Sequence, residues 1–252
     1  MLGRTRKELV YLVLAGMFVA NALLGEILGG KLIQVAGFTM SIGVIPWPVV
    51  FVTSDLVNEY FGREGVKRLT LLTASLIAYA FVIIYLTMQV PAAAVSPVQD
   101  AAFVSVLGQS LWIIVGSLAA FLVSQLVDVA VFWIFRKRTG GRFLWLRATG
   151  STAVSQLIDT FVVMGIGFWL PGKLTTHDYL NVSATNYTYK FAIALATTPL
   201  LYGIHAAVER FLGSEESHHL TEEAVEAELD RAEQIGLEHA LRAGSKHSAD
   251  GD

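Results

Sequence analysis

The sequence predicts an all-α protein that crosses a membrane several times, as a bundle of six transmembrane helices followed by an acidic tail. Of its 252 residues, 54% are hydrophobic and only 15% are charged, and the mean hydropathy is +0.56, which is high for a soluble domain. A helix needs about 20 apolar residues to cross the hydrocarbon core. Six segments of that length follow one another: residues 9–29, 43–62, 68–90, 107–135, 148–170 and 188–211.

The basic residues gather at one side of this predicted bundle. The loops on the opposite side carry Lys31, Lys173 and little else. Eleven cations precede the first segment, follow the second, or lie between the fourth and fifth: Arg4, Arg6, Lys7, Arg63, Lys67, Arg68, Arg136, Lys137, Arg138, Arg142 and Arg147. Because cytoplasmic loops carry the excess of lysine and arginine, both termini are expected in the cytoplasm.

The first segment and the loop after it have features of their own. The apolar run continues from Leu9 to about Gly30 without a small-residue cleavage site, so it is interpreted as a retained span and not a signal peptide. The loop, KLIQVAGFTMSIG at residues 31–43, alternates in part between polar and apolar residues and has turn formers at Ala36 and Gly37. A short β-hairpin on the outer face is therefore predicted.

The chain divides into a membrane domain, residues 1–212, and an acidic cytoplasmic tail, residues 213–252. The membrane domain holds 15 lysines and arginines against 10 acidic residues, whereas the tail holds 3 against 11. The stretch from Thr221 is typical of a solvated helix, with Thr221 as its N-cap and acids in its first turn. The tail histidines lack metal-ligand spacing and the chain has no cysteine, so neither a metal nor a cofactor is expected.

The second segment ends in TSDLVNEYFGREG, which places acids inside an apolar span. Asp55 lies about two turns from the cytoplasmic end and Glu59 about one turn, and their spacing of four residues puts both on one helix face. One interpretation of Glu59 is that it lies at the membrane interface and merely pairs with Arg63 or Lys67. Asp55 is deeper, so an interior or substrate-facing role is the better interpretation.

A five-residue motif recurs in the fourth and fifth segments, as SQLVD at Ser124 to Asp128 and SQLID at Ser155 to Asp159. In each copy the glutamine and the aspartate are three residues apart and share a helix face. An acid at mid-membrane costs about 2.5–3.5 kcal/mol on translocon scales, so these faces are expected to meet a polar interior and not lipid. Structural hydrogen bonding between helices remains an alternative for one of the acids.

The sixth segment supplies a basic residue, Lys190. Tyr187, Lys190, Thr198 and His205 fall within about a third of the circumference of an ideal helix and form one polar stripe. Pro199 is expected to interrupt this helix and to free the carbonyl of Leu195.

The first segment adds two polar residues. Asn21 is interpreted as pointing inward, whereas Glu26, on another face, is expected to be an outer partner of Lys190.

Several ordered motifs between Asn21 and Phe211 resemble those of the queuosine precursor transporter family, formerly described as a vitamin-uptake family. They are FVTSDLVNEYFGRE, SQLVDVAVF, WLRATGSTAVSQLIDT and YKFAIALATTPLLYG. The resemblance implies a six-span inner-membrane importer of 7-deazaguanines (preQ0, preQ1 or queuine) for tRNA modification. It implies a nucleobase and the lipid bilayer as partners, with no enzymatic activity and no nucleic acid bound. The tail lies outside these motifs, and the number of subunits, a homo-oligomer included, stays open.

The chemistry of such a substrate fits the polar residues in the spans. A guanine-like edge offers adjacent N–H donors that a carboxylate accepts, while amides can serve its carbonyl and ring nitrogens. The expected substrate-binding residues are Asn21, Asp55, Gln125, Asp128, Gln156, Asp159 and Lys190. The expected gating or ion-pair residues are Glu59, Arg63, Arg147 and His205. One or two of Trp47, Phe51, Tyr60, Phe132 and Phe161 are expected to form an aromatic slot.

Two other classes of function share features with this sequence. Paired aspartates could form an intramembrane aspartic hydrolase, but the chain lacks a GxGD motif and each aspartate accompanies a glutamine. A substrate-binding membrane subunit of an energised vitamin-uptake complex would also fit six spans. The chain has no Walker motif, so ATP is not its own energy source, whereas proton coupling and facilitated diffusion both stay open.

Overall fold

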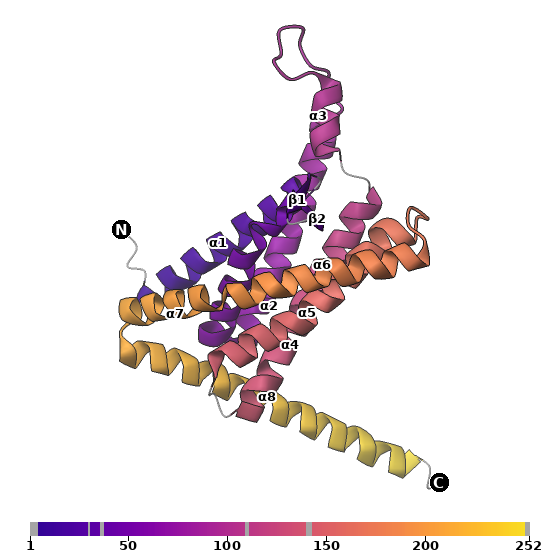
Figure 1. Ribbon diagram of the computed structural model, residues 1–252. Coiled ribbons are helices and arrows are strands. Elements are labelled where there is room, and N and C mark those ends of the chain that lie inside the picture. The colour runs from indigo at the N-terminus through magenta and orange to yellow at the C-terminus, as the bar shows by residue number, and fades with distance from the viewer. Residues whose placement is uncertain (1–4, 30, 36–37, 109–110, 140–142, 250–252) are drawn as a thin grey trace.

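A computed structural model describes residues 5–29, 31–35, 38–108, 111–139 and 143–249. Helices dominate these residues (Figure 1). They are α1 Arg6–Leu28, α2 Trp47–Thr87, α3 Asp100–Leu107, α4 Leu111–Thr139, α5 Leu144–Met164, α6 Thr176–Ala196, α7 Thr198–Leu212 and α8 Ser214–Ala249. A 3-10 turn, Ile42–Val44, precedes α2, and a π-helical turn, Gly165–Trp169, extends α5.

The predicted membrane segments are largely helical within the described residues. In the described part of the chain, four helical stretches are long and apolar enough to span a membrane, namely α1, α2, the stretch containing α4, and α5 with its π turn. The pair α6 and α7, bent by 41°, makes a fifth if it is counted as one span. The second and third predicted segments both belong to α2, whose 41 residues exceed the length of one crossing.

Gly62 divides α2 into two parts, residues 47–61 and 63–87. Its φ of 66° and ψ of −172° lie outside the helical region, in a conformation that glycine adopts without a Cβ penalty. In Figure 1 the chain turns back here, and the second part leads towards α3. The second and third predicted spans therefore correspond to the two parts of α2, on either side of the sharp break at Gly62.

The break predicted at Pro199 is confirmed, and it separates α6 from α7. Pro199, in the first turn of α7, has no N–H to donate, and in a continuous helix its ring would clash with a carbonyl of the preceding turn. The predicted stripe from Tyr187 to His205 therefore spans two helices of different direction, so it is not one continuous face. Tyr187 stacks on Phe191, and His205 stacks on Tyr60 with centroids 5.4 Å apart.

The predicted hairpin is present as β1, Leu32–Val35, and β2, Phe38–Ser41. The strands are antiparallel, with Leu32 opposite Ser41 and Val35 opposite Phe38. Its predicted turn residues, Ala36 and Gly37, lie outside the described residues. The hairpin joins α1 to α2 at the end of the bundle that lies near α3 in Figure 1.

Helix ends in the bundle follow local sequence signals. Thr5 and Glu8 form a capping box at the start of α1, since each side chain accepts a hydrogen bond from the other residue's backbone N–H. Thr175 caps α6 by accepting from the backbone of Asp178. Arg136, the first of three consecutive cations in the last turn of α4, lies where the helix dipole favours positive charge.

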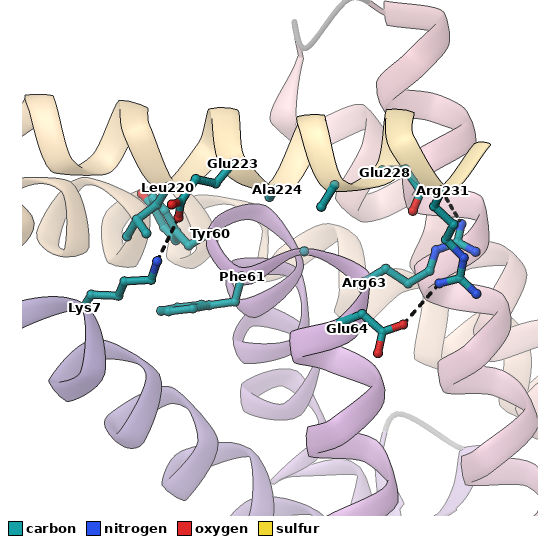
Figure 2. Close-up of a pocket in the computed structure, with 12 residues that line it drawn as sticks. Lys7, Tyr60, Phe61, Arg63, Glu64, Leu220, Glu223, Ala224, Glu228 and Arg231 are labelled. Carbon is teal, nitrogen blue, oxygen red and sulfur yellow. Dashed lines mark hydrogen bonds and ion pairs between the residues drawn. The ribbon is translucent and has the colours of Figure 1, made fainter. Parts of the chain in front are cut away.

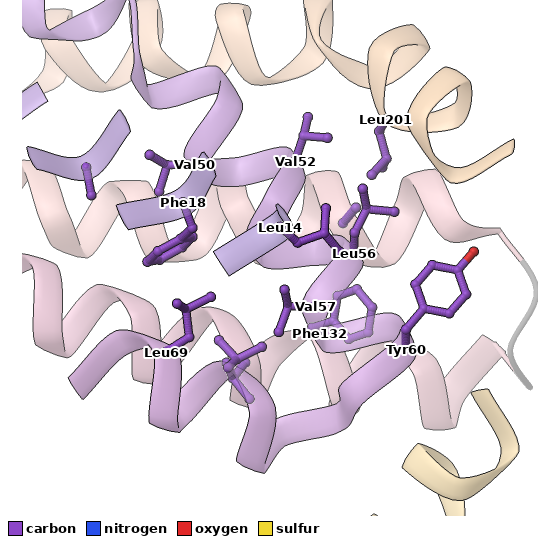
Figure 3. Close-up of a cluster of buried hydrophobic side chains, with 14 of the residues drawn as sticks. Leu14, Phe18, Val50, Val52, Leu56, Val57, Tyr60, Leu69, Phe132 and Leu201 are labelled. Carbon is purple, nitrogen blue, oxygen red and sulfur yellow. The ribbon is translucent and has the colours of Figure 1, made fainter. Parts of the chain in front are cut away.

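The apolar core is built around the first part of α2. All residues from 50 to 60 are buried, so this segment is enclosed on every side by other helices. Figure 3 shows Leu14 and Phe18 of α1, Phe132 of α4 and Leu201 of α7 around it. Any polar side chain on this part of α2 is consequently an interior group.

The tail helix α8 is not the freely solvated helix that the sequence suggested. It begins at Ser214, and Thr221 lies inside it, donating to the carbonyl of Ser217, so Thr221 is not an N-cap. Its buried residues recur every three or four positions, as an amphipathic helix requires: Ser217, Leu220, Ala224 and Glu228. This face packs on the turn of α2, where Ala224 lies against Gly62 (Figure 2).

Three ion pairs join α8 to the membrane domain, as Figure 2 shows. Glu228 pairs with Arg63 at 3.0 Å, Glu223 with Lys7 at 2.8 Å, and Arg231 with Glu64 at 3.3 Å. The hydrogen bond from Lys7 lowers the pKa of Glu223, but that pair is exposed and contributes little to stability. The largely buried Glu228 with Arg63 is the stronger attachment.

Replacing Glu228 by alanine is expected to loosen α8 from α2 and to lower the thermal stability of the purified protein. The change removes a charged hydrogen bond worth about 1.5–3 kcal/mol. Glu226→Ala is the matched control, because Glu226 is an exposed acid on the same helix. Thermal unfolding in detergent measures both variants, and equal midpoints would contradict the docking of α8 on α2.

Candidate functional site

Three acids of the membrane domain converge where α2, α4 and α5 meet. Asp55 and Glu59 come from α2, and Asp128 comes from α4; each is at most 5% exposed. Asp55 lies within electrostatic range of Asp128, Glu59 and Arg147. The structure therefore brings together acids that the sequence placed on separate segments.

Glu59 lies at the centre of an ion-pair cluster that joins α2, α4 and α5. One of its carboxylate oxygens accepts from Arg136 of α4 at 2.9 Å, and the other pairs with Arg147 of α5 at 2.6 Å. Both guanidinium groups also lie over aromatic rings, Arg136 over Trp133 and Arg147 over Phe132. A buried carboxylate with two arginine partners fixes the ends of α4 and α5 against α2.

The ion partners of Glu59 differ in part from those expected. Arg147, one of the expected ion-pair residues, binds Glu59, but Arg63 does not, because Arg63 binds Glu228 of α8 instead. Arg142, a basic residue of the same loop region, lies outside the described residues. The second partner is Arg136, which follows Gln125 by eleven residues and so lies on the same face of α4 three helical turns later. That spacing is the signal that could have identified it.

The two copies of the repeated motif lie on neighbouring helices and are linked to each other. Ser155 of the second copy donates to Asp128 of the first at 2.9 Å. Gln125 accepts from Ser54 of α2 at 3.2 Å. The serine of the motif had been given no role from the sequence, although it forms the direct contact between the copies.

Asn58 adds a further link between α2 and α4. Its side-chain oxygen accepts from the indole N–H of Trp133 at 2.9 Å, in the interior of the bundle. Neither Asn58 nor Trp133 had been predicted as a site residue. Asn58 follows Asp55 by three residues and shares its helix face, so helical spacing was the available signal for it. Trp133 follows Asp128 by five residues and lies on another face, so helical spacing does not identify it.

Asp159, the acid of the second copy, has a different partner. Lys190 of α6 binds it at 2.7 Å, and both side chains are mostly buried. Glu26 of α1, expected to pair with Lys190, accepts instead from Ser117 of α4, although it remains within electrostatic range of Lys190 and Asp159. The repeated acids therefore differ: Asp128 accepts from a neutral hydroxyl, and Asp159 is ion-paired.

The remaining predicted residues lie around these groups. Gln156 is buried on α5, one turn from Asp159. Asn21 donates to the carbonyl of Met17 in its own helix and is only half-buried, so it is not brought to the acids. His205 stacks on the ring of Tyr60 near the turn of α2.

The predicted aromatic slot is dispersed. Phe51 lies beside Asp55 on a small pocket and stacks on Trp47 with centroids 5.9 Å apart. Tyr60 and Phe132 belong to the apolar core, and Phe161 packs edge-on against Tyr179. Of the five predicted aromatics, Phe51 is therefore the one placed next to an acid in that pocket.

Known proteins share these motifs. The sequence model of the family described as "Putative vitamin uptake transporter" matches residues 41–204. A "Probable queuosine precursor transporter" of Bacillus subtilis (strain 168) is 33% identical over 174 residues, which cover 68% of this chain and 74% of that protein. One of the same name from Haemophilus influenzae is 23% identical over 169 residues, covering 64% and 66%. No solved structure matches.

Proposed function

Since this chain belongs to the "Putative vitamin uptake transporter" family, a family of multi-pass membrane transporters and not of enzymes, we propose that it imports 7-deazaguanine precursors of queuosine for tRNA modification. The family assigns it a small-molecule substrate and a place in the bilayer. Two relatives named as queuosine precursor transporters support the choice of substrate.

The observation that carries the proposal is the set of acids and amides buried inside the bundle. Asp55, Asp128 and Gln125 stand within the contact region of α2 and α4, and Gln156 and Asp159 follow on α5. Carboxylates accept the paired N–H donors of a guanine-like edge, and amides can both donate and accept. Burying such groups within a membrane is energetically unfavourable, and ionisable residues there typically mark a substrate pathway.

The proposed location is the bacterial inner membrane, with both termini in the cytoplasm. Lys7, near the start of α1, pairs with Glu223 of the tail, so the two terminal segments lie at the same end of the bundle. Arg136 and Arg147, from the most basic of the loops, approach that end as well. Positive charge on that side supports a cytoplasmic assignment.

Uptake of preQ0, preQ1 and queuine tests the function directly. Cells that lack precursor synthesis and their own importer should regain queuosine in their tRNA when they express this chain and receive a substrate. Empty-vector cells are the control, and the three compounds supplied separately identify which is carried. No queuosine with any of them, at confirmed membrane expression, would reject the proposal. A strict requirement for a copurifying ATPase would identify a subunit of an energised complex.

A further inference from the structure

A small pocket at the α6–α7 break lies beside Asp55 and is part of none of the contacts described above. It is bounded by α2, α5 and the residues on both sides of the break. Its polar lining consists of Asp55 and four threonines, Thr149, Thr152, Thr197 and Thr198, and Phe51 contributes an aromatic ring. Resting on the function proposed above, we propose that this pocket is part of the substrate site, and that it takes a flat heterocycle whose N–H groups donate to Asp55.

Asp55 is the group that requires a ligand. Its Oδ1 atom is buried and has no hydrogen-bond partner within the described residues. Arg147, whose positive charge acts on Asp55, directs its Nη2 atom to Glu59. A buried carboxylate oxygen without a donor is costly, and the loss of its hydration is offset only by a partner that donates to it. Adjacent N–H groups on one edge of a heterocycle supply those donors.

The rest of the lining suits the same kind of molecule. A threonine hydroxyl both donates and accepts, so it can bond a carbonyl or a ring nitrogen of a bound heterocycle. Phe51 offers a ring face for stacking. Apart from Asp55, the lining carries no charged side chain, so a phosphorylated or strongly anionic ligand is disfavoured.

The pocket is too small for a heterocycle in this conformation. Its volume is about 10 Å³, room for one water molecule at most, so a heterocycle cannot enter without movement. Thr149 of α5 and Thr198 of α7 both line it and narrow it, with their hydroxyl oxygens 3.3 Å apart. The helical hydrogen bonds between α6 and α7 are already interrupted at their 41° break. A movement of α7 away from α5 about this break therefore costs few further helical hydrogen bonds. Separation of these two threonines is therefore the step that admits the ligand.

A cysteine pair tests the closure, and the chain is suited to it because it has no cysteine of its own. In Thr149→Cys/Thr198→Cys, oxidation to a disulfide is expected to hold α7 against α5 and stop uptake, and a reductant is expected to restore it. Thr175→Cys/Asp178→Cys is the matched control, since these side chains also touch but lie in the exposed N-terminal turn of α6. A disulfide in the first pair that leaves uptake unchanged overturns the proposal.

Ligand protection tests the occupant. In purified Thr152→Cys, preQ1 is expected to slow maleimide labelling, and Asp55→Asn in the same background is expected to weaken that protection roughly tenfold or more. Guanine, which presents the same donor edge, is measured in parallel. If cells import a deazaguanine but neither compound protects the cysteine, the pocket assignment alone fails. If guanine protects while no deazaguanine is imported, the proposed function alone fails.

Discussion

Asp128→Asn is expected to lose most uptake while the protein still inserts and folds. Ser155 can still donate to the amide oxygen of the new asparagine, so the contact between α4 and α5 survives. What changes is the second oxygen, which is replaced by an NH2 group that donates and therefore cannot accept from a substrate N–H. The loss of a hydrogen bond to a charged group is worth about 1.5–3 kcal/mol, or roughly ten- to hundredfold in affinity.

Asp159→Asn is expected to be equally inactive, but it needs a separate control because of Lys190. Removing the carboxylate leaves the mostly buried ammonium of Lys190 without its partner, which is destabilising in itself. The double variant Asp159→Asn/Lys190→Met removes that stranded charge. If Asp159 binds substrate, the double variant regains stability and remains inactive.

Uptake by these variants is measured at matched membrane levels and compared with Asp230→Asn. Asp230 is an exposed aspartate of α8, so this control makes the same chemical change outside the bundle. Full uptake by Asp128→Asn would remove Asp128 from the site. Recovery of uptake in Asp159→Asn/Lys190→Met would show that Asp159 serves only as the counterion of Lys190.

The sequence was sufficient for the membrane segments because hydropathy reports them directly. Within the described residues each of the six segments is largely helical, although the sixth is divided between α6 and α7. The break near Pro199 follows from the missing N–H and from the clash that the proline ring would cause in a continuous helix. The joining of two segments in α2 was not foreseen. It depends on the backbone of Gly62, which a hydropathy profile does not register.

The composition of the site was more predictable than its pairing. Periodicity along a helix identified Asp55, Asp128 and Asp159 as interior groups, because spacing determines which residues share a face. Periodicity does not show whether Lys190 pairs with Asp159, as it does in the structure, or with Glu26. Such choices depend on how neighbouring helices are rotated and displaced, and a single sequence does not specify either quantity.

The docking of the tail helix on α2 was likewise not predicted, because it depends on contacts between segments that are distant in the sequence. Its charge indicated a solvated helix, yet one narrow face with Leu220 and Ala224 is apolar and small enough to lie on Gly62. Ion pairs with Lys7 and Arg63 need partners more than 160 residues away in the chain, and local patterns do not reveal them. Acidic composition therefore described the outer face of α8 and concealed its inner one.

Glu59→Gln is expected to weaken the cytoplasmic end of the bundle and to slow transport while substrate binding persists. The carboxylate of Glu59 serves Arg136 and Arg147 at once, and glutamine has one acceptor oxygen, so one buried guanidinium loses its partner. Breaking a buried ion pair from one side costs about 3–5 kcal/mol. Thermal unfolding, preQ1 binding to purified protein and uptake in cells are the three measurements.

The matched control for this change is Glu64→Gln, five residues further along α2. Glu64 pairs with Arg231 at the surface, at 3.3 Å, so its loss is expected to cost about 1 kcal/mol or less. The double variant Glu59→Gln/Arg136→Gln should recover part of the lost stability, because it removes a stranded guanidinium and leaves Arg147 with an acceptor. Loss of preQ1 binding in Glu59→Gln with unchanged thermal stability would contradict a gating role. Glu59 would then be a substrate ligand, and closure of the cytoplasmic end would have to depend on other contacts, such as Arg63 with Glu228.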